Sequence, residues 1–339
     1  MIKAAIIAMA SILAVEAAYC QTEASHAKPA SLRTPDGHPS LEGIWTSASV
    51  VPMERPANLK GKEFYTEQEA AENAMQVLGM SSWERLGSQA PEHYNMSQYG
   101  LDLSQVKVAS TLRTSLIVGP DGRVPPLTPE AQKRRGGDAY SRRTSDEGAR
   151  EEDPGFEGSE AYNDPEIRPL AERCLVGFSS TSGPPILPTY FYNNLHQIVQ
   201  TKDSVMILTE MVHDARVVRI NGQHPPSTVR KWLGDSIGHW DGDTLVVETT
   251  NFTDKTRFRG STENMKVIER FTRIDARTLR YQFTVEDPAT WTRPWTAEYA
   301  WPATKDLLYE YACQEGNYAL GNILRGARLK EKEEAAKKQ

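Results

Sequence analysis

The feature that most constrains the fold is a run of short β-type segments between His196 and Trp301. Each segment is apolar or alternates apolar and polar residues, and turn residues separate it from the next. Alternation with a period of two is typical of strands that bury one face. We predict strands at 196–201, 204–210, 214–220, 237–240, 244–250, 265–273, 278–286 and 295–301.

The connections between these segments predict how the strands pair. Lys202-Asp203 and Asp241-Gly242 are tight turns, and the second pair is a strong signal for a hairpin. No long helical pattern interrupts the run, so parallel crossover units are not supported. We therefore predict a mainly all-β fold. Its core is an antiparallel meander that closes into a barrel or forms a strongly curved sheet, with an N-terminal helical segment and long loops.

The N-terminus has the pattern of a secretory signal. Lys3 precedes an apolar run over 4–15, and small residues follow around 17–20. The run is too short for a membrane-spanning helix, which needs about 20 apolar residues, and no other stretch is long enough. We predict a signal peptide over 1–20, a polar linker over 21–40 and a periplasmic or secreted protein. The alternative is a buried N-terminal helix.

Cysteine use bears on the same question of compartment. If Cys20 leaves with the signal peptide, Cys174 and Cys313 remain. Two cysteines in an oxidising compartment can pair, so we predict a disulfide between them. Two separate buried cysteines are the alternative, because the sequence does not show whether the two Cα atoms lie within bonding range. Bulky Tyr19 disfavours a lipid anchor on Cys20.

The rest of the chain divides by composition. Residues 41–127 form the N-terminal part of the barrel domain, with a helix at 66–78 that Thr66 can cap and a strand at 111–118. Residues 128–170 hold a basic and then an acidic block without periodicity, which is typical of a solvated loop. We place the meander within 171–325 and a charged, exposed helical tail over 326–339.

Parts of the chain resemble known groups of proteins. Gly43-Ile44-Trp45 resembles the Gly-x-Trp opening of lipocalin-type barrels, and the predicted meander is similar to the same group. This resemblance implies a lipocalin-like barrel. The stretches 234–252 and 284–296 resemble those of a large, mostly uncharacterised family of exported bacterial proteins. That resemblance implies export and carries no established chemistry, so no catalytic residue is transferred from it.

Charge and motifs exclude several classes of protein. The chain carries 39 basic and 45 acidic side chains, a net charge of −6, with the signs well mixed. A nucleic-acid binder usually has a basic patch or stripe instead. The sequence has no P-loop, dinucleotide fingerprint, HExxH or GxSxG motif. We therefore expect a small-molecule substrate and no cofactor. His213 and His239 fall short of a metal site, which wants three or four ligands.

His213 is the main candidate for proton transfer. It follows an apolar strand, and histidine exchanges protons most readily near neutral pH. A regular strand would place it on one face with Met211 and Val217. We predict that it lines a cavity and acts as general acid or base, with His239 or Tyr192 as its catalytic partner. A core histidine bonded to a backbone carbonyl is the alternative.

Other polar and aromatic residues near the strand ends are candidates for substrate binding. Trp240 beside His239 can stack a ring-shaped ligand, and Arg293 can make a cation–π contact or neutralise a carboxylate. The amides before the first strand can bind a sugar or a phenolic ring, or brace the barrel rim. The predicted substrate-binding residues are Asn193, Asn194, His196, Glu210, Trp240, Glu248, Arg293 and Trp295.

These residues support three hypotheses of function. The first is an exported enzyme that acts by acid–base chemistry, as a lyase, hydratase or isomerase, on a small ring-containing compound. The second is a non-catalytic carrier of an apolar or aromatic molecule, with a mostly apolar cavity. The third is a surface protein that binds a partner through 128–170. An enzyme would differ from a carrier by titratable groups that converge in the cavity with shifted pKa values.

Overall fold

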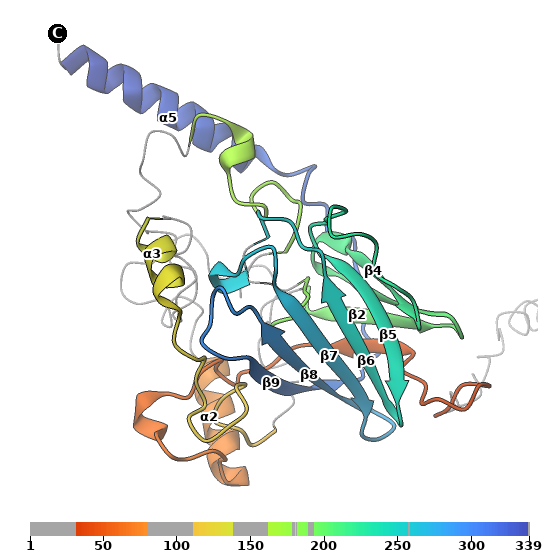
Figure 1. The fold of residues 1–339 in the computed structure, drawn as a ribbon. Helices are drawn as coiled ribbons and strands as arrows, with labels where there is room; N and C mark the ends of the chain where they lie inside the picture. The colour runs from red at the N-terminus through yellow and green to blue at the C-terminus, as the bar shows by residue number, and fades with distance from the viewer. Residues whose placement is uncertain are drawn as a thin grey trace, which may run out of the picture.

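The computed structural model describes residues 32–79, 111–137, 162–177, 180, 182–188, 193–256 and 258–337. Its main element is one sheet of nine strands in sequence order (Figure 1). The strands are β1 (Gly43–Thr46), β2 (Leu195–Gln200), β3 (Ser204–Thr209), β4 (Ala215–Ile220), β5 (Asp235–Asp241), β6 (Thr244–Thr250), β7 (Lys266–Arg273), β8 (Thr278–Glu286) and β9 (Trp295–Pro302). Strands β2–β9 confirm the eight predicted segments, with small differences at their ends.

The sheet curves until its first and last strands meet. Trp45 of β1 forms a bridge with Ala303, just beyond β9, and the Thr304 amide donates to the Ile44 carbonyl at 2.9 Å. Neighbouring strands are antiparallel except for β4 and β5. The prediction of a mainly β fold whose meander curls into a barrel is confirmed, and the barrel is nearly closed.

The pairing of β4 with β5 departs from the prediction. Arg219 pairs with Ile237 in parallel, so the expectation of an entirely antiparallel meander is wrong at this point. The connection over 221–234 is long enough to carry the chain back across the sheet before β5 begins, as a parallel pair requires. It does so without a helix. The crossover was not predicted, because no helical pattern in the sequence marks it.

The barrel interior is filled mainly by aromatic and branched side chains. Alternate residues of each strand point inward, because successive side chains lie on opposite faces. The rings of Tyr281 and Trp301 lie 4.8 Å apart, and Phe271 packs against both. The largest almost fully buried side chains are Trp45, Phe252, Phe271, Tyr281, Phe283, Tyr299 and Trp301. The interior is therefore a packed core at most levels of the barrel.

Two helices lie in the N-terminal half of the described residues (Figure 1). Helix α2 (Glu67–Gly79) confirms the predicted helix and its cap. The Glu69 amide donates to Thr66 Oγ1 at 3.2 Å, and the Glu69 carboxylate accepts from the Thr66 amide at 2.8 Å. Helix α3 (Pro129–Gly137) forms where a loop was predicted. Residues 138–161 of that charged segment lie outside the described residues.

The predicted strand at 111–118 is not a regular strand. Ile117 forms an isolated bridge with Ala297 of β9, and Arg113 forms another with Phe64. The Glu298 amide donates to the Leu116 carbonyl at 2.9 Å. The segment therefore lies along β9 and continues the sheet with only a few bonds.

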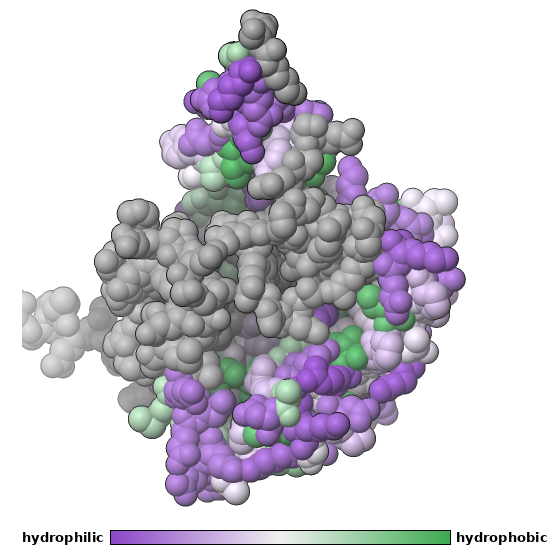
Figure 2. Space-filling view, turned by 90° about the vertical axis from the view of Figure 1, so that its left-hand side faces the viewer, coloured by the Kyte–Doolittle hydropathy of each residue, from purple (hydrophilic) through white to green (hydrophobic). Residues whose placement is uncertain are grey.

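The C-terminal part leaves the barrel as helix α5 (Tyr318–Lys337), which starts before the predicted tail and projects outward (Figure 1). None of its residues is buried, and the described residues at its far end are mostly hydrophilic (Figure 2). Just before the helix, Cys313 forms a disulfide with Cys174, with the Cα atoms 5.8 Å apart. The predicted disulfide is thus present, and it ties the chain before α5 to the segment 162–177.

Candidate functional site

The barrel interior holds a group of buried polar side chains toward one end. Most of its members come from the starts of β2, β4 and β5 and the ends of β3 and β6. These meet at the same end of the sheet because β4 and β5 run in parallel and the other neighbouring strands are antiparallel. We call this group the polar end of the barrel. It consists of His196, Thr209, Arg216, Ser236, Thr249, Glu269 and Tyr281. Burying such groups is costly unless each finds a hydrogen-bond partner.

Arg216 and Glu269 form a buried ion pair at the centre of the polar end. The two carboxylate oxygens accept from the guanidinium, one of them at 2.8 Å. The Tyr281 hydroxyl donates to the same carboxylate at 2.8 Å, and Arg216 also donates to Ser236 at 3.3 Å. Burial opposes the charge on Arg216, but Glu269 raises its pKa above the ordinary value. Burial raises the pKa of Tyr281 well above its ordinary value, so this hydroxyl stays protonated.

His196 lies in the polar end with one ring nitrogen unpaired. Its Nδ1 is 3.1 Å from Thr209 Oγ1, and its ring stacks on Trp301 with the centroids 4.6 Å apart. Its Nε2 is buried and has no hydrogen-bond partner within the described part of the chain. Burial, and then the charge of Arg216, lower the pKa of His196 to about 3. The imidazole is therefore neutral at physiological pH.

A short segment, 182–188, reaches into the barrel beside the polar end, and we call it the strap. Ile186 is fully buried. Its amide donates to the Tyr281 hydroxyl oxygen at 2.9 Å, and its carbonyl accepts from the Tyr299 hydroxyl at 2.9 Å. Gly183 in the strap has a φ of +70°, a conformation that favours glycine. The strap thus provides hydrogen-bond partners for the hydroxyl groups of Tyr281 and Tyr299 inside the barrel.

Asp214 connects the turn after β3 to the strap. Burial raises the pKa of the Asp214 carboxyl to about 6, although a hydrogen bond with Ser182 of the strap acts in the opposite direction. Oδ2 of Asp214 is buried without a partner among the described residues. Ser182 Oγ also accepts from the Gly177 amide at 2.9 Å. Ser182 therefore joins the strap to both the preceding loop and Asp214.

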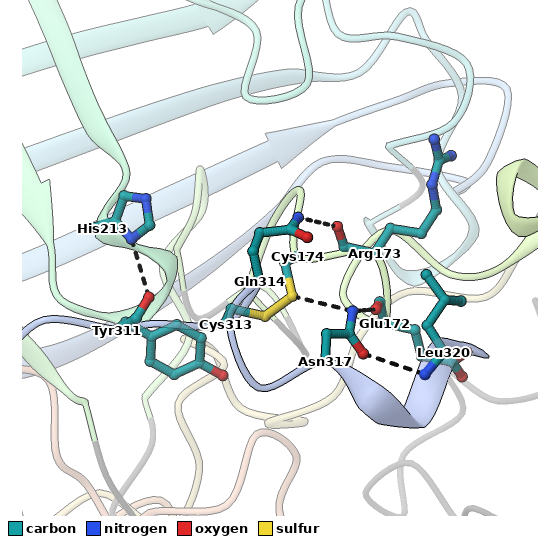
Figure 3. The surroundings of a disulfide bond; sticks show 9 residues. All are labelled: Glu172, Arg173, Cys174, His213, Tyr311, Cys313, Gln314, Asn317 and Leu320. Carbon is teal, nitrogen blue, oxygen red and sulfur yellow. Dashed lines mark hydrogen bonds between the residues drawn. A yellow bond between two sulfur atoms is a disulfide. The ribbon is translucent and has the colours of Figure 1, made fainter. Parts of the chain in front are cut away.

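His213, the main catalytic candidate from the sequence, does not line the barrel. It belongs to η9 (Met211–His213), a 3-10 turn between β3 and β4, and its side chain is exposed. Its Nδ1 lies 3.2 Å from the carbonyl oxygen of Tyr311 (Figure 3). The predicted strand placement on a cavity wall is wrong, because the turn breaks the alternation. Its catalytic role stays a prediction that this placement does not support.

Four further predicted residues lie away from the polar end. His239 and Arg293 are exposed. Glu248 points outward from β6, and its carboxylate lies 3.5 Å from Nε2 of His224. Trp240 is half-buried at the opposite end of the barrel, where it stacks on His38 with the ring centroids 4.5 Å apart. These positions do not converge on one ligand.

Three other predicted residues serve the framework around the barrel. Asn194 accepts a hydrogen bond from Thr46 Oγ1 at 2.9 Å, which braces the rim between β1 and β2. Glu210 is buried and accepts from the Tyr309 amide at 2.9 Å, which holds the C-terminal segment. Trp295 is a buried member of the core. The rim-bracing interpretation of the amides therefore agrees with the contacts of Asn194.

Two predicted residues precede β2 directly. Asn193 is half-buried and takes the left-handed conformation, with a φ of +48°. Tyr192, the predicted partner of His213, lies outside the described residues, so its role stays a prediction.

His196 is the predicted site residue that the fold places in the polar end. Glu269 and Arg216 were not among the predicted site residues. The alternation of residues in β7 nevertheless pointed to Glu269. It occupies an inward-facing position of the strand, between the inward-facing Val267 and Phe271. A charged side chain at that position must pair with an opposite charge inside the barrel. Its partner, Arg216, lies on β4, 53 positions earlier in the chain. The sequence alone does not show that these two residues face each other.

Comparison of the chain with protein-family models, curated proteins and solved structures found no match. Within the described ranges, no helix has the length and apolar character needed to cross a bilayer. The same ranges contain no cluster of three or more His, Cys, Asp or Glu side chains suited to a metal ion.

Proposed function

We propose that this chain is an exported protein that binds a small ring-containing compound at the polar end of the barrel and acts on it by acid–base chemistry. The observation that carries the proposal is the unpaired, buried Nε2 of His196. A buried polar atom without a partner costs roughly 1–3 kcal/mol. A polar group of a ligand beside Nε2 would remove that cost.

The surroundings of His196 support a ring as the ligand's main body. Trp301 stacks on the imidazole, and Tyr281 and Tyr299 place their rings next to Trp301. Aromatic walls with a few convergent polar groups are typical of small-molecule sites. The two tyrosine hydroxyls bond the strap, so a ligand that reaches them would displace Ile186.

Export is supported by two independent features. Residues 1–20 have the composition of a secretory signal. The disulfide between Cys174 and Cys313 is consistent with an extracytoplasmic location, because thiols in the cytosol are kept reduced. An exported barrel fits a ligand that the cell meets outside its cytoplasm.

A non-catalytic carrier is the second candidate, and the pKa of His196 favours it. A general base works best when its pKa lies near the operating pH, whereas burial lowers that of His196 to about 3. A carrier needs the same site without proton transfer. The two functions therefore differ in what happens to the ligand after it binds.

One experiment in D₂O tests the proposal and separates the two candidates. Phenol, benzoate and 2-cyclohexenone are incubated with the protein, saturation-transfer NMR reports binding, and loss of proton signals reports exchange at carbon. We expect at least one probe to bind and to exchange about 10²-fold faster than without protein. His196→Asn should abolish the acceleration, and His239→Asn, at an exposed position, should not.

Each outcome has one meaning. Binding without exchange, weakened by His196→Asn, would identify a carrier. Binding that His196→Asn leaves unchanged, or no binding by any probe, would contradict the site proposed here. Near-UV circular dichroism confirms that each variant keeps the packed aromatic core.

A further inference from the structure

Building on the proposed function, we infer that the polar end recognises a negatively charged oxygen on the ligand's ring, a phenolate or enolate, held between His196 Nε2 and the Arg216 guanidinium. The inference names the ligand's chemical class and gives each of the two side chains a role. Both would donate hydrogen bonds to the same oxygen.

His196 can donate because of its bond to Thr209. In the tautomer in which the Thr209 hydroxyl donates to Nδ1, over the observed 3.1 Å, the ring proton resides on Nε2. The low pKa of His196 keeps the ring neutral, so it donates without carrying a charge of its own. A neutral imidazole in this state polarises an oxygen and still releases the ligand.

Arg216 supplies the positive charge. Among the described residues the guanidinium donates three hydrogen bonds, to Ser236 and Glu269, whereas it has five N–H donors. Tyr281 also donates to the Glu269 carboxylate that binds Arg216.

Arg216 lies on β4 opposite Ile207, and His196 lies on β2 opposite Thr209, so the two inward-facing side chains flank β3. In agreement with this placement, the charge of Arg216 is a cause, after burial, of the lowered pKa of His196.

The sign of the ligand's charge follows from these donors. A cation at Nε2 would be repelled by Arg216, and a purely apolar group would leave Nε2 unpaired. An anionic oxygen accepts from both side chains, and charge-assisted hydrogen bonds are about twice as strong as neutral ones. Donors placed where charge develops typically contribute about 10²–10³ in rate. The same pair would therefore stabilise an enolate that forms when a C–H bond of the ligand breaks, the proton passes to water and the electron pair moves onto the oxygen.

Binding of 4-nitrophenol tests this inference by colour, without an activity assay. Ionisation breaks the phenol O–H bond, the proton goes to water, and the electron pair stays on oxygen as the yellow phenolate. We expect the wild-type protein to raise the acid dissociation constant of the bound probe about tenfold, which is about 1.4 kcal/mol. At a pH near the probe's own pKa, the bound fraction is then mostly phenolate.

Two substitutions at one position separate the role of Nε2 from that of the fold. In His196→Gln the amide nitrogen can reach the place of Nε2, and we expect most of the shift to remain. In His196→Asn the shorter side chain ends near the position of the histidine Nδ1, so the shift in the ionisation of bound 4-nitrophenol should disappear. Thr209→Val removes the hydroxyl that sets the tautomer and should reduce the shift, which keeps the test decisive if His196→Asn does not fold.

The outcomes separate this inference from the proposed function. If 4-nitrophenol binds with its ionisation unchanged, or if His196→Asn keeps the full shift, the inference is overturned while the proposed function stands. If 4-nitrophenol fails to bind although another ring probe binds, the inference is likewise overturned. If no ring compound binds at all, the proposed function fails and the inference fails with it.

Discussion

Burial shifts the pKa values of two residues, Asp214 and His196, in opposite directions for the same physical reason. It raises the pKa of Asp214 to about 6 and lowers that of His196 to about 3. In each case the low-dielectric surroundings disfavour the charged form, which is the deprotonated acid for Asp214 and the protonated base for His196. At neutral pH the barrel therefore holds a neutral imidazole, whereas Asp214 is forced to carry its charge.

Asp214→Asn tests the cost of that charge. The folded-state pKa of Asp214 lies above its ordinary value of 3.8, so its stabilising contribution is complete below about pH 4 and is lost as the pH rises through 6. We expect the variant's free energy of unfolding, relative to wild type, to increase by about 1 kcal/mol between pH 4 and pH 8. The modest value allows for screening by solvent around a partly exposed carboxyl.

Urea unfolding at the two pH values measures this difference. Asparagine still accepts a hydrogen bond from Ser182, so the strap keeps its contact. Asp203→Asn, at an exposed position on the turn between β2 and β3, is the control and should show no such dependence. An equal effect of Asp214→Asn at both pH values would contradict the raised pKa.

The strap is the element that decides how the polar end is covered. It carries no regular secondary structure, and its position depends on the two bonds of Ile186 to phenols and on the sharp bend at Gly183. The bend brings the Ile186 side chain close to Gly183. A Cβ added at Gly183 would overlap the Ile186 side chain, so one of them would have to move.

Gly183→Ala should therefore destabilise the protein by about 2–3 kcal/mol. About 1 kcal/mol comes from the left-handed φ, and the rest comes from overpacking. Gly61→Ala is the matched control, because Gly61 has a φ of +81° and nothing within 4 Å of the added Cβ. Chemical denaturation measures both variants, and equal losses would show that the Ile186 contact has no effect. Amide exchange at Ile186 reports whether the strap has moved.

At the scale of the whole molecule, the disulfide joins two segments that lie outside the sheet. It links the segment 162–177 to the chain before α5, beside hydrogen bonds from Gln314 to the Arg173 carbonyl and from Asn317 to the Glu172 carbonyl (Figure 3). Its residues are 139 positions apart. A cross-link over such a loop restricts the unfolded chain strongly, and the chain-entropy model sets an upper value of roughly 5 kcal/mol.

Replacing both cysteines, Cys174→Ser with Cys313→Ser, should lower the free energy of unfolding by about 3 kcal/mol, which is typical of a native disulfide. Urea unfolding followed by tryptophan fluorescence measures the loss. Wild-type protein treated with a reductant should lose a similar amount, which separates the cross-link from the effect of the serines. Free thiols in the denatured, unreduced protein would show that the bond does not form.

Local patterns in the sequence were enough to predict most of the strands and helix α2. The alternation within 278–286 and 244–250 predicted β8 and β6 without error at either end, and Thr66 predicted the cap of α2. These features depend on residues within a few positions of one another. The same local reasoning misplaced His213, because a turn of three residues between two strands disturbs the alternation on which its face depended.

The barrel as a whole depends on contacts between distant parts of the chain. The chain's own pattern of alternation and turns determined that it is mainly β and where β2–β9 lie, but it did not predict β1 and it predicted a strand at 111–118 where the structure has only isolated bridges. Tertiary structure decided that β4 and β5 run in parallel, that β1 meets β9, and that Arg216 faces Glu269 across 53 positions of sequence. The reason is physical: period-two alternation sets the face of each side chain locally, whereas the partner across the barrel is chosen by curvature, strand order and the need to pair a buried charge.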